Sequence, residues 1–202
     1  MIGFQQRLVN QFLMVLVLSP GVISAAERTD PIHQRFSNSQ AQPSFQRHVL
    51  PLMSKVGCSG RACHGSFQGQ GGFRLSLFGY DFKNDYEALV GGEQPRVDRS
   101  SPAESLILRK PTLQEDHHGG QILEVGSWQY NILRRWIETG AIDDSGPNRE
   151  ISHLEVQPAE LLFQRLGETI PLRVLAHWHD GTLEDVTDIA RFRTNDESVA
   201  AV

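Results

Sequence analysis

Cys58-Ser59-Gly60-Arg61-Ala62-Cys63-His64 contains both cysteines of the chain and places a histidine directly after the second one. The usual signature for covalent haem attachment is C-x-x-C-H, in which the thiols add across the haem vinyl groups and the histidine becomes the proximal iron ligand. Four residues separate the thiols here instead of two, and Gly60 would ease the bulge that this spacing requires. The motif predicts one covalent haem c, anchored by Cys58 and Cys63, with His64 as proximal ligand.

Other interpretations of the cysteine pair stay open at this point. In an exported chain the two thiols can form a disulfide that closes a small loop, with His64 as a bystander. A zinc or iron–sulfur site is disfavoured, because structural zinc takes four ligands and the chain has only two thiols. The disulfide is therefore the main alternative to haem.

The first 26 residues have the features of a secretory signal peptide. Arg7 supplies the positively charged n-region, and Phe12 to Leu18 forms a short apolar h-region. Ser24-Ala25-Ala26 offers the small residues of a cleavage site. The run is short for a membrane span, so an uncleaved anchor is the lesser alternative. We expect a secreted protein of the periplasm or cell surface with no membrane span in its mature chain, a location where covalent haem and lasting disulfides are both found.

Composition limits the function classes. A net charge of -5 gives no basic footprint and argues against nucleic acid as a partner. No nucleophile, carboxylate pair or metal cage suggests a reaction, so an electron carrier is favoured over an enzyme. The predicted segments are a signal peptide (1–26), a linker (27–44), a helical domain (45–142), a second linker (143–150) and a β-patterned domain (151–202).

Residues 45–56 have apolar side chains at three- and four-residue steps, which predicts an amphipathic helix that ends just before the cysteine motif. Pro51 should kink or shorten this helix. Beyond the motif, Phe73, Leu75 and Leu77 alternate with polar residues, which predicts a short strand or an extended segment. The haem motif is therefore expected at the C-terminal end of a helix.

Three more helices are expected before residue 142. Start signals at Asn84 and at Ser101 predict two short ones. The clearest helix is capped by Ser127 and ends at Gly140. Its apolar stripe consists of Trp128, Ile132, Leu133, Trp136 and Ile137.

Residues 151–202 have the alternating pattern of β-strands. Leu154 and Val156 alternate with polar residues, residues 170–176 do the same, and Asp180-Gly181 predicts a hairpin turn. His177 and His179 flank Trp178 close to this turn, but without a third ligand they do not indicate a metal site.

Residues 49–141 resemble the c-type cytochrome domain found near the N-terminus of large exported planctomycete proteins, and more broadly the class I cytochrome c fold, in which the first and last helices cross. The matching residues are Val49-Leu50-Pro51, Gly57-Cys58, Ala62-Cys63-His64-Gly65, Gly69-Gln70-Gly71-Gly72-Phe73, Leu75-Ser76-Leu77-Phe78-Gly79-Tyr80-Asp81, Asp85-Tyr86, Ser105-Leu106, Lys110-Pro111, His118-Gly119-Gly120 and Trp136-Ile137.

The last fifty residues resemble the start of a bacterial Ig-like domain of the invasin-associated type, on Leu154-x-Val156-x-Pro158, Gly167-x-Thr169, Leu172-x-Val174, Asp180-Gly181, Asp185-Val186-Thr187 and Asn195 to Val202. Such a domain needs roughly a hundred residues, so further domains are expected beyond residue 202. The two resemblances together imply a mainly α cytochrome c-like domain followed by an incomplete all-β Ig-like sandwich.

The family resemblance raises the question of the second iron ligand. All three methionines precede Cys58, so methionine ligation from the usual downstream side is excluded. His118 is the predicted ligand and His117 the second choice, and a bis-histidine iron should have a lower potential than a His/Met site. If neither histidine binds, the iron is five-coordinate and open to small ligands. In that case both histidines lie in a solvated polar loop. Candidate pocket walls are Phe73, Trp128 and Trp136.

The predicted function is electron transfer or redox sensing by an exported mono-haem domain, the N-terminal part of a larger protein with an unidentified redox partner. The alternative is a structural or adhesive surface module in which Cys58 and Cys63 form a disulfide and no haem is bound. Only the haem-containing domain would absorb visible light.

Overall fold

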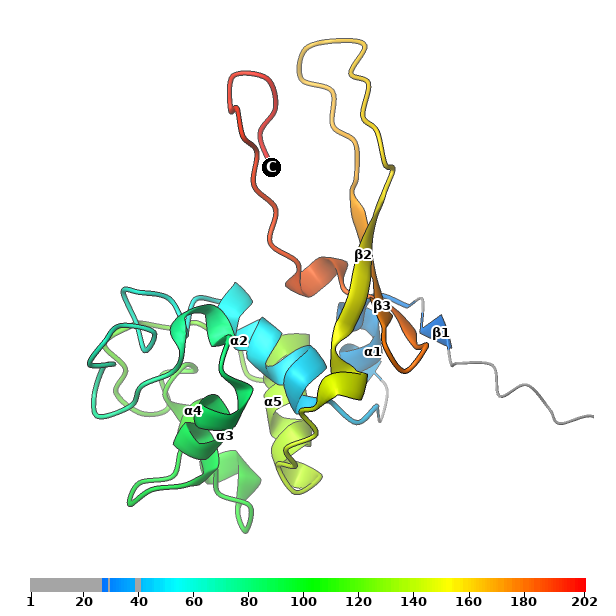
Figure 1. Cartoon of the computed structure of the whole chain (residues 1–202). Coiled ribbons are helices and arrows are strands. Elements are labelled where there is room, and N and C mark those ends of the chain that lie inside the picture. The colour runs from blue at the N-terminus through cyan, green and yellow to red at the C-terminus, as the bar shows by residue number, and fades with distance from the viewer. Residues whose placement is uncertain (1–26, 29, 39–40) are drawn as a thin grey trace, which may run out of the picture.

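The computed structural model describes residues 27–28, 30–38 and 41–202, so the predicted signal peptide at residues 1–26 lies outside the described residues. Its α-helices are short, from four to eleven residues. They are α1 (Ile32–Asn38), α2 (Leu50–Lys55), α3 (Phe82–Val90), α4 (Leu106–Arg109) and α5 (Trp128–Glu138), and the strands are β1 (Glu27–Arg28), β2 (Ile151–Gln157), β3 (Arg173–Trp178) and β4 (Leu183–Asp185) (Figure 1).

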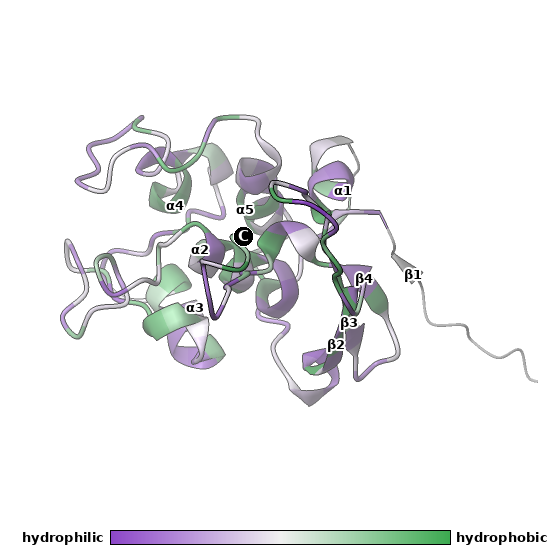
Figure 2. Cartoon of the chain, turned by 90° about the horizontal axis from the view of Figure 1, so that it is seen from above, coloured by the Kyte–Doolittle hydropathy of each residue, from purple (hydrophilic) through white to green (hydrophobic). Residues whose placement is uncertain are grey.

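The helix predicted after Ser127 is confirmed as α5, which lies at the centre of the molecule (Figure 2). The Ser127 hydroxyl accepts a hydrogen bond from the backbone N–H of Tyr130, and Gly140 follows the helix with a φ of 100°. Ile132, Leu133, Trp136 and Ile137 are buried. Seen from above, α2 and α5 lie between the sheet and α1 on one side and α3 and α4 on the other (Figure 2).

The helix before the cysteine motif is confirmed, although it is irregular. It starts as a five-residue π-helix, η1 (Phe45–Val49), and continues as α2, with Pro51 in the first turn of α2 where its missing N–H is harmless. The Phe45 ring stacks on Trp136 with centroids 5.3 Å apart. This contact packs the start of the helix on α5. It therefore fixes the position of the cysteine motif, which follows the C-terminal end of α2.

Two smaller predictions are wrong. Of the strand or extended segment expected at residues 73–77, the strand is absent, since Phe73 makes only an isolated bridge with Gln70. The caps of two helices also differ: Asp81, not Asn84, caps α3, and Ser101 precedes a 3-10 turn without a side-chain cap hydrogen bond. Asp81 reaches the N–H of Asn84, so the helix begins one turn earlier than its sequence suggested.

The strands form one sheet in the order β1-β4-β3-β2. β2, β3 and β4 are antiparallel neighbours, and β1 pairs in parallel with β4. The predicted turn at Asp180-Gly181 is confirmed between β3 and β4. The long connection between β2 and β3 extends away from the helices (Figure 1).

The fold class predicted above, a mainly α cytochrome c-like domain followed by an incomplete Ig-like sandwich, is wrong. The helices are short and separated by long loops, and the described strands form a single sheet with no second sheet facing it. The inner side of this sheet is covered by helices: Val174 and Trp178 belong to the same core as Ile32 and Phe36 of α1. Alternation along a strand shows only that one face is buried and cannot tell what buries it.

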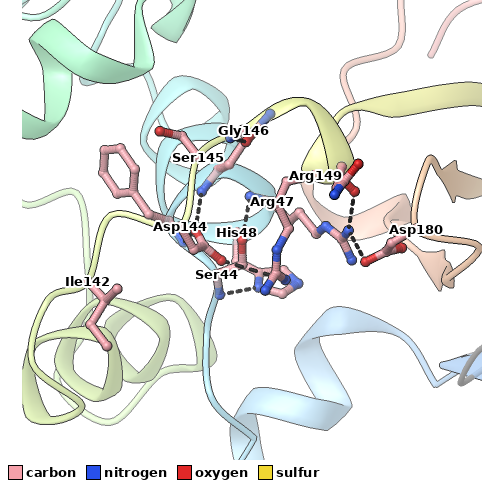
Figure 3. Close-up of polar contacts among 12 residues, drawn as sticks. Ser44, Arg47, His48, Ile142, Asp144, Ser145, Gly146, Arg149 and Asp180 are labelled. Carbon is pink, nitrogen blue, oxygen red and sulfur yellow. Dashed lines mark hydrogen bonds and ion pairs between the residues drawn. The ribbon is translucent and has the colours of Figure 1, made fainter.

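Charged groups also join the sheet to the helices. Arg47 of η1 is buried and donates to the Asp180 carboxylate of the β3–β4 turn over 2.6 Å (Figure 3), and its guanidinium lies 4.4 Å from the Trp178 ring centroid. Glu184 of β4 is fully buried and accepts from Arg35 of α1 at 3.0 Å, with Nε2 of His48 at 3.4 Å. The helices and the sheet therefore share a charged interface as well as a core.

None of the α-helices in the described ranges combines the length and the apolar character needed to cross a membrane.

Candidate functional site

The cysteine motif forms a loop that closes on itself at the end of α2. The N–H of Cys58 donates to the Met53 carbonyl at 2.9 Å, and the N–H of His64 donates to the Cys58 carbonyl at 3.0 Å. Gly65 completes the closure, because a Cβ at this position would lie 2.0 Å from the Ser59 carbonyl oxygen. The four-residue spacing is thus accommodated by a compact bulge that leaves Cys58 and His64 in hydrogen-bond contact through their backbones.

Both cysteines are free and half-buried, so they form no disulfide with each other. Burial, together with the negative charge of a Cys63 thiolate, raises the pKa of the Cys58 thiol to about 11. Cys58 is therefore a neutral thiol near pH 7.

His64 has a defined tautomer. Its Nδ1 lies 3.1 Å from the Phe73 carbonyl oxygen, which can only accept, so Nδ1 carries the proton and Nε2 has the lone pair. Burial lowers the pKa of His64, opposed by the carbonyl of Phe73. Phe73 also packs against the imidazole with ring centroids 4.7 Å apart. His64 is thus a neutral, oriented imidazole of the kind that binds transition metals.

A second imidazole lies beside it. The ring centroid of His117 is 6.4 Å from that of His64, and the two planes are inclined by 22°. Nδ1 of His117 donates to the Gly120 carbonyl at 2.8 Å, so this histidine too is protonated on Nδ1 and has its lone pair on Nε2. Two long loops, one after α2 and one before α5, therefore meet where these two histidines lie. Both imidazoles are protonated on Nδ1.

The remaining predicted site residues lie apart from this pair or at its edge. His118 has a 99% exposed side chain, with Nε2 3.9 Å from the Asp116 carboxylate. Trp136 is buried in the core against Phe45, and Trp128 is half-buried at the start of α5. Only Phe73 of the three predicted walls has a ring contact with His64.

Arg96 is a residue that the sequence interpretation missed. It is buried, and its guanidinium lies over the Phe73 ring at 5.2 Å from the centroid. Phe73 and Arg96 also line a cavity of about 500 Å³ together with Arg74, Glu87 and several glycines. No local pattern marks Arg96 in the sequence, because its partner lies more than twenty residues earlier.

Within the described ranges, no group of three or more His, Cys, Asp and Glu side chains is arranged to hold a metal ion. A haem iron does not require such a group, because the porphyrin supplies four of its nitrogen ligands and the protein only the axial ones. Comparison with protein-family models, with curated proteins and with solved structures found no match to this chain.

Proposed function

We propose that this chain carries one covalently bound haem c and serves in electron transfer or redox sensing, as an exported protein of the periplasm or cell surface. The observation that carries the proposal is the closed loop at the end of α2, which holds two free thiols and an oriented imidazole within seven residues. This is the set of groups that covalent haem attachment requires.

The residues fit such a group chemically. Cys58 and Cys63 would each add an S–H across one vinyl group, the sulfur to one carbon and the hydrogen to the other, so that no oxidant is consumed. Cys58 and Cys63 are both free for this reaction. His64 would ligate through Nε2, because Nδ1 is occupied by the Phe73 carbonyl.

When bound, the haem supplies the one-electron chemistry. The contribution of this chain would be to hold the His64 imidazole in a fixed orientation, through its hydrogen bond to the Phe73 carbonyl. Phe73 packs on the His64 ring, and Arg96 covers Phe73 in turn. Burial and axial ligation are two of the means by which a protein sets the potential of its haem.

The alternative is a surface module without haem that is closed by a Cys58–Cys63 disulfide. The two free thiols favour the haem proposal over it. The paired imidazoles of His64 and His117 favour haem as well, because a disulfide alone gives no reason for two histidines with the same tautomer to face one another.

The proposal is tested by producing the chain with a periplasmic haem-attachment system and staining a denaturing gel for haem peroxidase activity. The wild-type band should stain, and the double variant Cys58→Ala/Cys63→Ala should not. Leu162→Ala is the control, a change at an exposed side chain of the β2–β3 connection away from the motif, and should stain like the wild type. A colourless wild-type band together with no titratable thiol would favour the disulfide module instead.

A further inference from the structure

We propose that His117, and not the neighbouring His118, is the second axial ligand, so that the iron is held between His64 and His117. This inference rests on the proposed haem function and adds the ligand that the cysteine motif alone cannot identify.

The spacing of the two rings fits a shared metal ion. A metal–imidazole bond is about 2 Å long and a ring nitrogen lies about 1 Å from the ring centroid, so two imidazoles on opposite sides of one ion have centroids about 6 Å apart. The His64 and His117 ring centroids lie 6.4 Å apart, close to this value. By contrast, His153 and His177 on β2 and β3 stack at 4.0 Å and 13°, which is a direct ring contact with no room for an ion.

The hydrogen bonds of the two histidines are those of metal ligands. Ligating histidines almost always donate their second ring N–H to a carbonyl or carboxylate, which fixes the ring and leaves the other nitrogen for the metal. Nδ1 of His64 donates to Phe73 and Nδ1 of His117 donates to Gly120. Each imidazole is therefore prepared to bind through Nε2.

The loop that carries His117 is held in place. The N–H groups of Ile122 and Leu123 donate to the Pro111 carbonyl, and Lys110 donates to the carbonyl of Asp116. Leu123 is buried in the core. Because the loop is anchored on both sides of the histidines, the approach of His117 to His64 does not depend on a freely moving segment.

The turn at Gly119-Gly120 gives the two adjacent histidines different positions. A Cβ at Gly119 would lie 2.8 Å from Cε1 of His117, so the imidazole packs directly on the glycine backbone. The N–H of Gly120 returns to the His117 carbonyl at 2.9 Å, which closes a tight turn. This turn presents His117 beside His64, whereas His118 remains almost fully exposed.

The test uses the full chain purified with its covalent haem, examined by optical and electron paramagnetic resonance spectroscopy in the oxidised state. The wild type should be low-spin and should bind carbon monoxide poorly when reduced. His117→Ala should lose the low-spin signal and gain carbon monoxide binding, and added imidazole should restore the low-spin spectrum. The matched control His118→Ala should keep the wild-type spectrum.

A second variant guards against loss of folding. His117→Met keeps a ligand at the position and should raise the midpoint potential, since axial methionine raises it. The inference is overturned if His117→Ala keeps the wild-type spectrum, or if His118→Ala is the variant that becomes high-spin; in both cases haem staining would still support the proposed function. Absence of covalent haem from the wild type would overturn the proposed function itself, and this inference with it.

Discussion

At the scale of single residues, the candidate site depends on backbone groups as much as on side chains. The carbonyls of Phe73 and Gly120 decide which nitrogen of each histidine is free. Glycines let the backbone come close enough for this: Gly65 lies against the Ser59 carbonyl, and Gly119 lies against the His117 ring. The chemistry of the motif therefore extends to residues that have no side chain.

Gly65→Ala tests this dependence. The new Cβ would lie 2.0 Å from the Ser59 carbonyl oxygen, so the motif loop has to open. We expect a loss of about 1–3 kcal/mol in the free energy of unfolding, as for other overpacked sites, together with a clear loss of covalent haem. Denaturant unfolding and haem staining measure the two effects.

Gly146→Ala is the control for that variant, because no heavy atom lies within 4 Å of the Cβ it would add. It should bind haem like the wild type. If Gly65→Ala is as stable as Gly146→Ala and stains equally, the tight closure of the motif loop is not needed for attachment.

How far the sequence predicts the site also depends on individual residues. The motif itself indicated Cys58, Cys63 and His64 because their spacing is local. The choice between His117 and His118 could not be made from spacing, since adjacent residues point in different directions and the direction is set by the turn at Gly119-Gly120. A pair of glycines directly after a pair of histidines is the signal that points to such a turn.

At the scale of elements, the periodicity of apolar residues predicted the positions of the helices well. The residues expected to cap these helices were predicted less well. The stripe of α5 and its cap at Ser127 were both evident from sequence because they involve neighbours three or four residues apart. The strand expected at 73–77 is absent from this segment because alternation over five residues is weak where no neighbouring strand pairs with it. The backbone there is instead used by the site, through the Phe73 carbonyl.

The contact between β4 and the helices makes a prediction at this scale. Glu184 is fully buried and accepts from Arg35, with His48 beside it. Removing one charge from a buried pair leaves the other uncompensated, so Glu184→Gln should cost about 3–5 kcal/mol of unfolding free energy. Urea unfolding followed by circular dichroism measures the loss.

Glu155→Gln is the matched control on β2, where the carboxylate is exposed and bonds His177 at 3.1 Å. An exposed pair of this kind is screened by solvent, so its loss should cost far less than the loss of the buried Glu184 pair. If the two variants lose equal stability, the buried cluster at Glu184 does not join sheet to helices as described.

At the scale of the whole molecule, the sequence misled because it says little about which elements pack together. The β-patterned residues suggested a sandwich, yet the helical residues supply the other layer, and β1 at the start of the described chain pairs with β4 near its end. Contacts between residues separated by 149 positions, such as Arg35 and Glu184, leave no periodic pattern in the sequence. The cysteine motif is contiguous, so a candidate site can be proposed from the sequence, but whether it binds haem stays a prediction.

The charged interface also predicts how the whole molecule responds to acid. Although burial raises the pKa of Glu184, His48 and Arg35 outweigh it and hold that pKa well below its usual range. For Asp180, burial is likewise outweighed by Thr182 and Arg47, which lower the pKa to about 2. The unfolded chain binds protons at these carboxylates near pH 4, before the folded one does, so stability should fall as pH drops from about 5 toward 2.

Urea midpoints recorded between pH 7 and pH 3 check this expectation. The wild type should lose stability steadily below pH 5, and Glu184→Gln, which lacks one of the two carboxylates, should lose less over the same interval. Equal midpoints at pH 6 and pH 3 for the wild type would show that these carboxylates do not stabilise the folded state.

The central claim is that Cys58 and Cys63 hold one haem, and mass spectrometry of the proteolytic peptide that contains both residues tests it most directly. The chain should be produced with a haem-attachment system and digested after denaturation. We predict that this peptide carries the mass of one haem on its two cysteines. A peptide with two unmodified thiols, or one lighter by two hydrogens because of a disulfide, would contradict the claim.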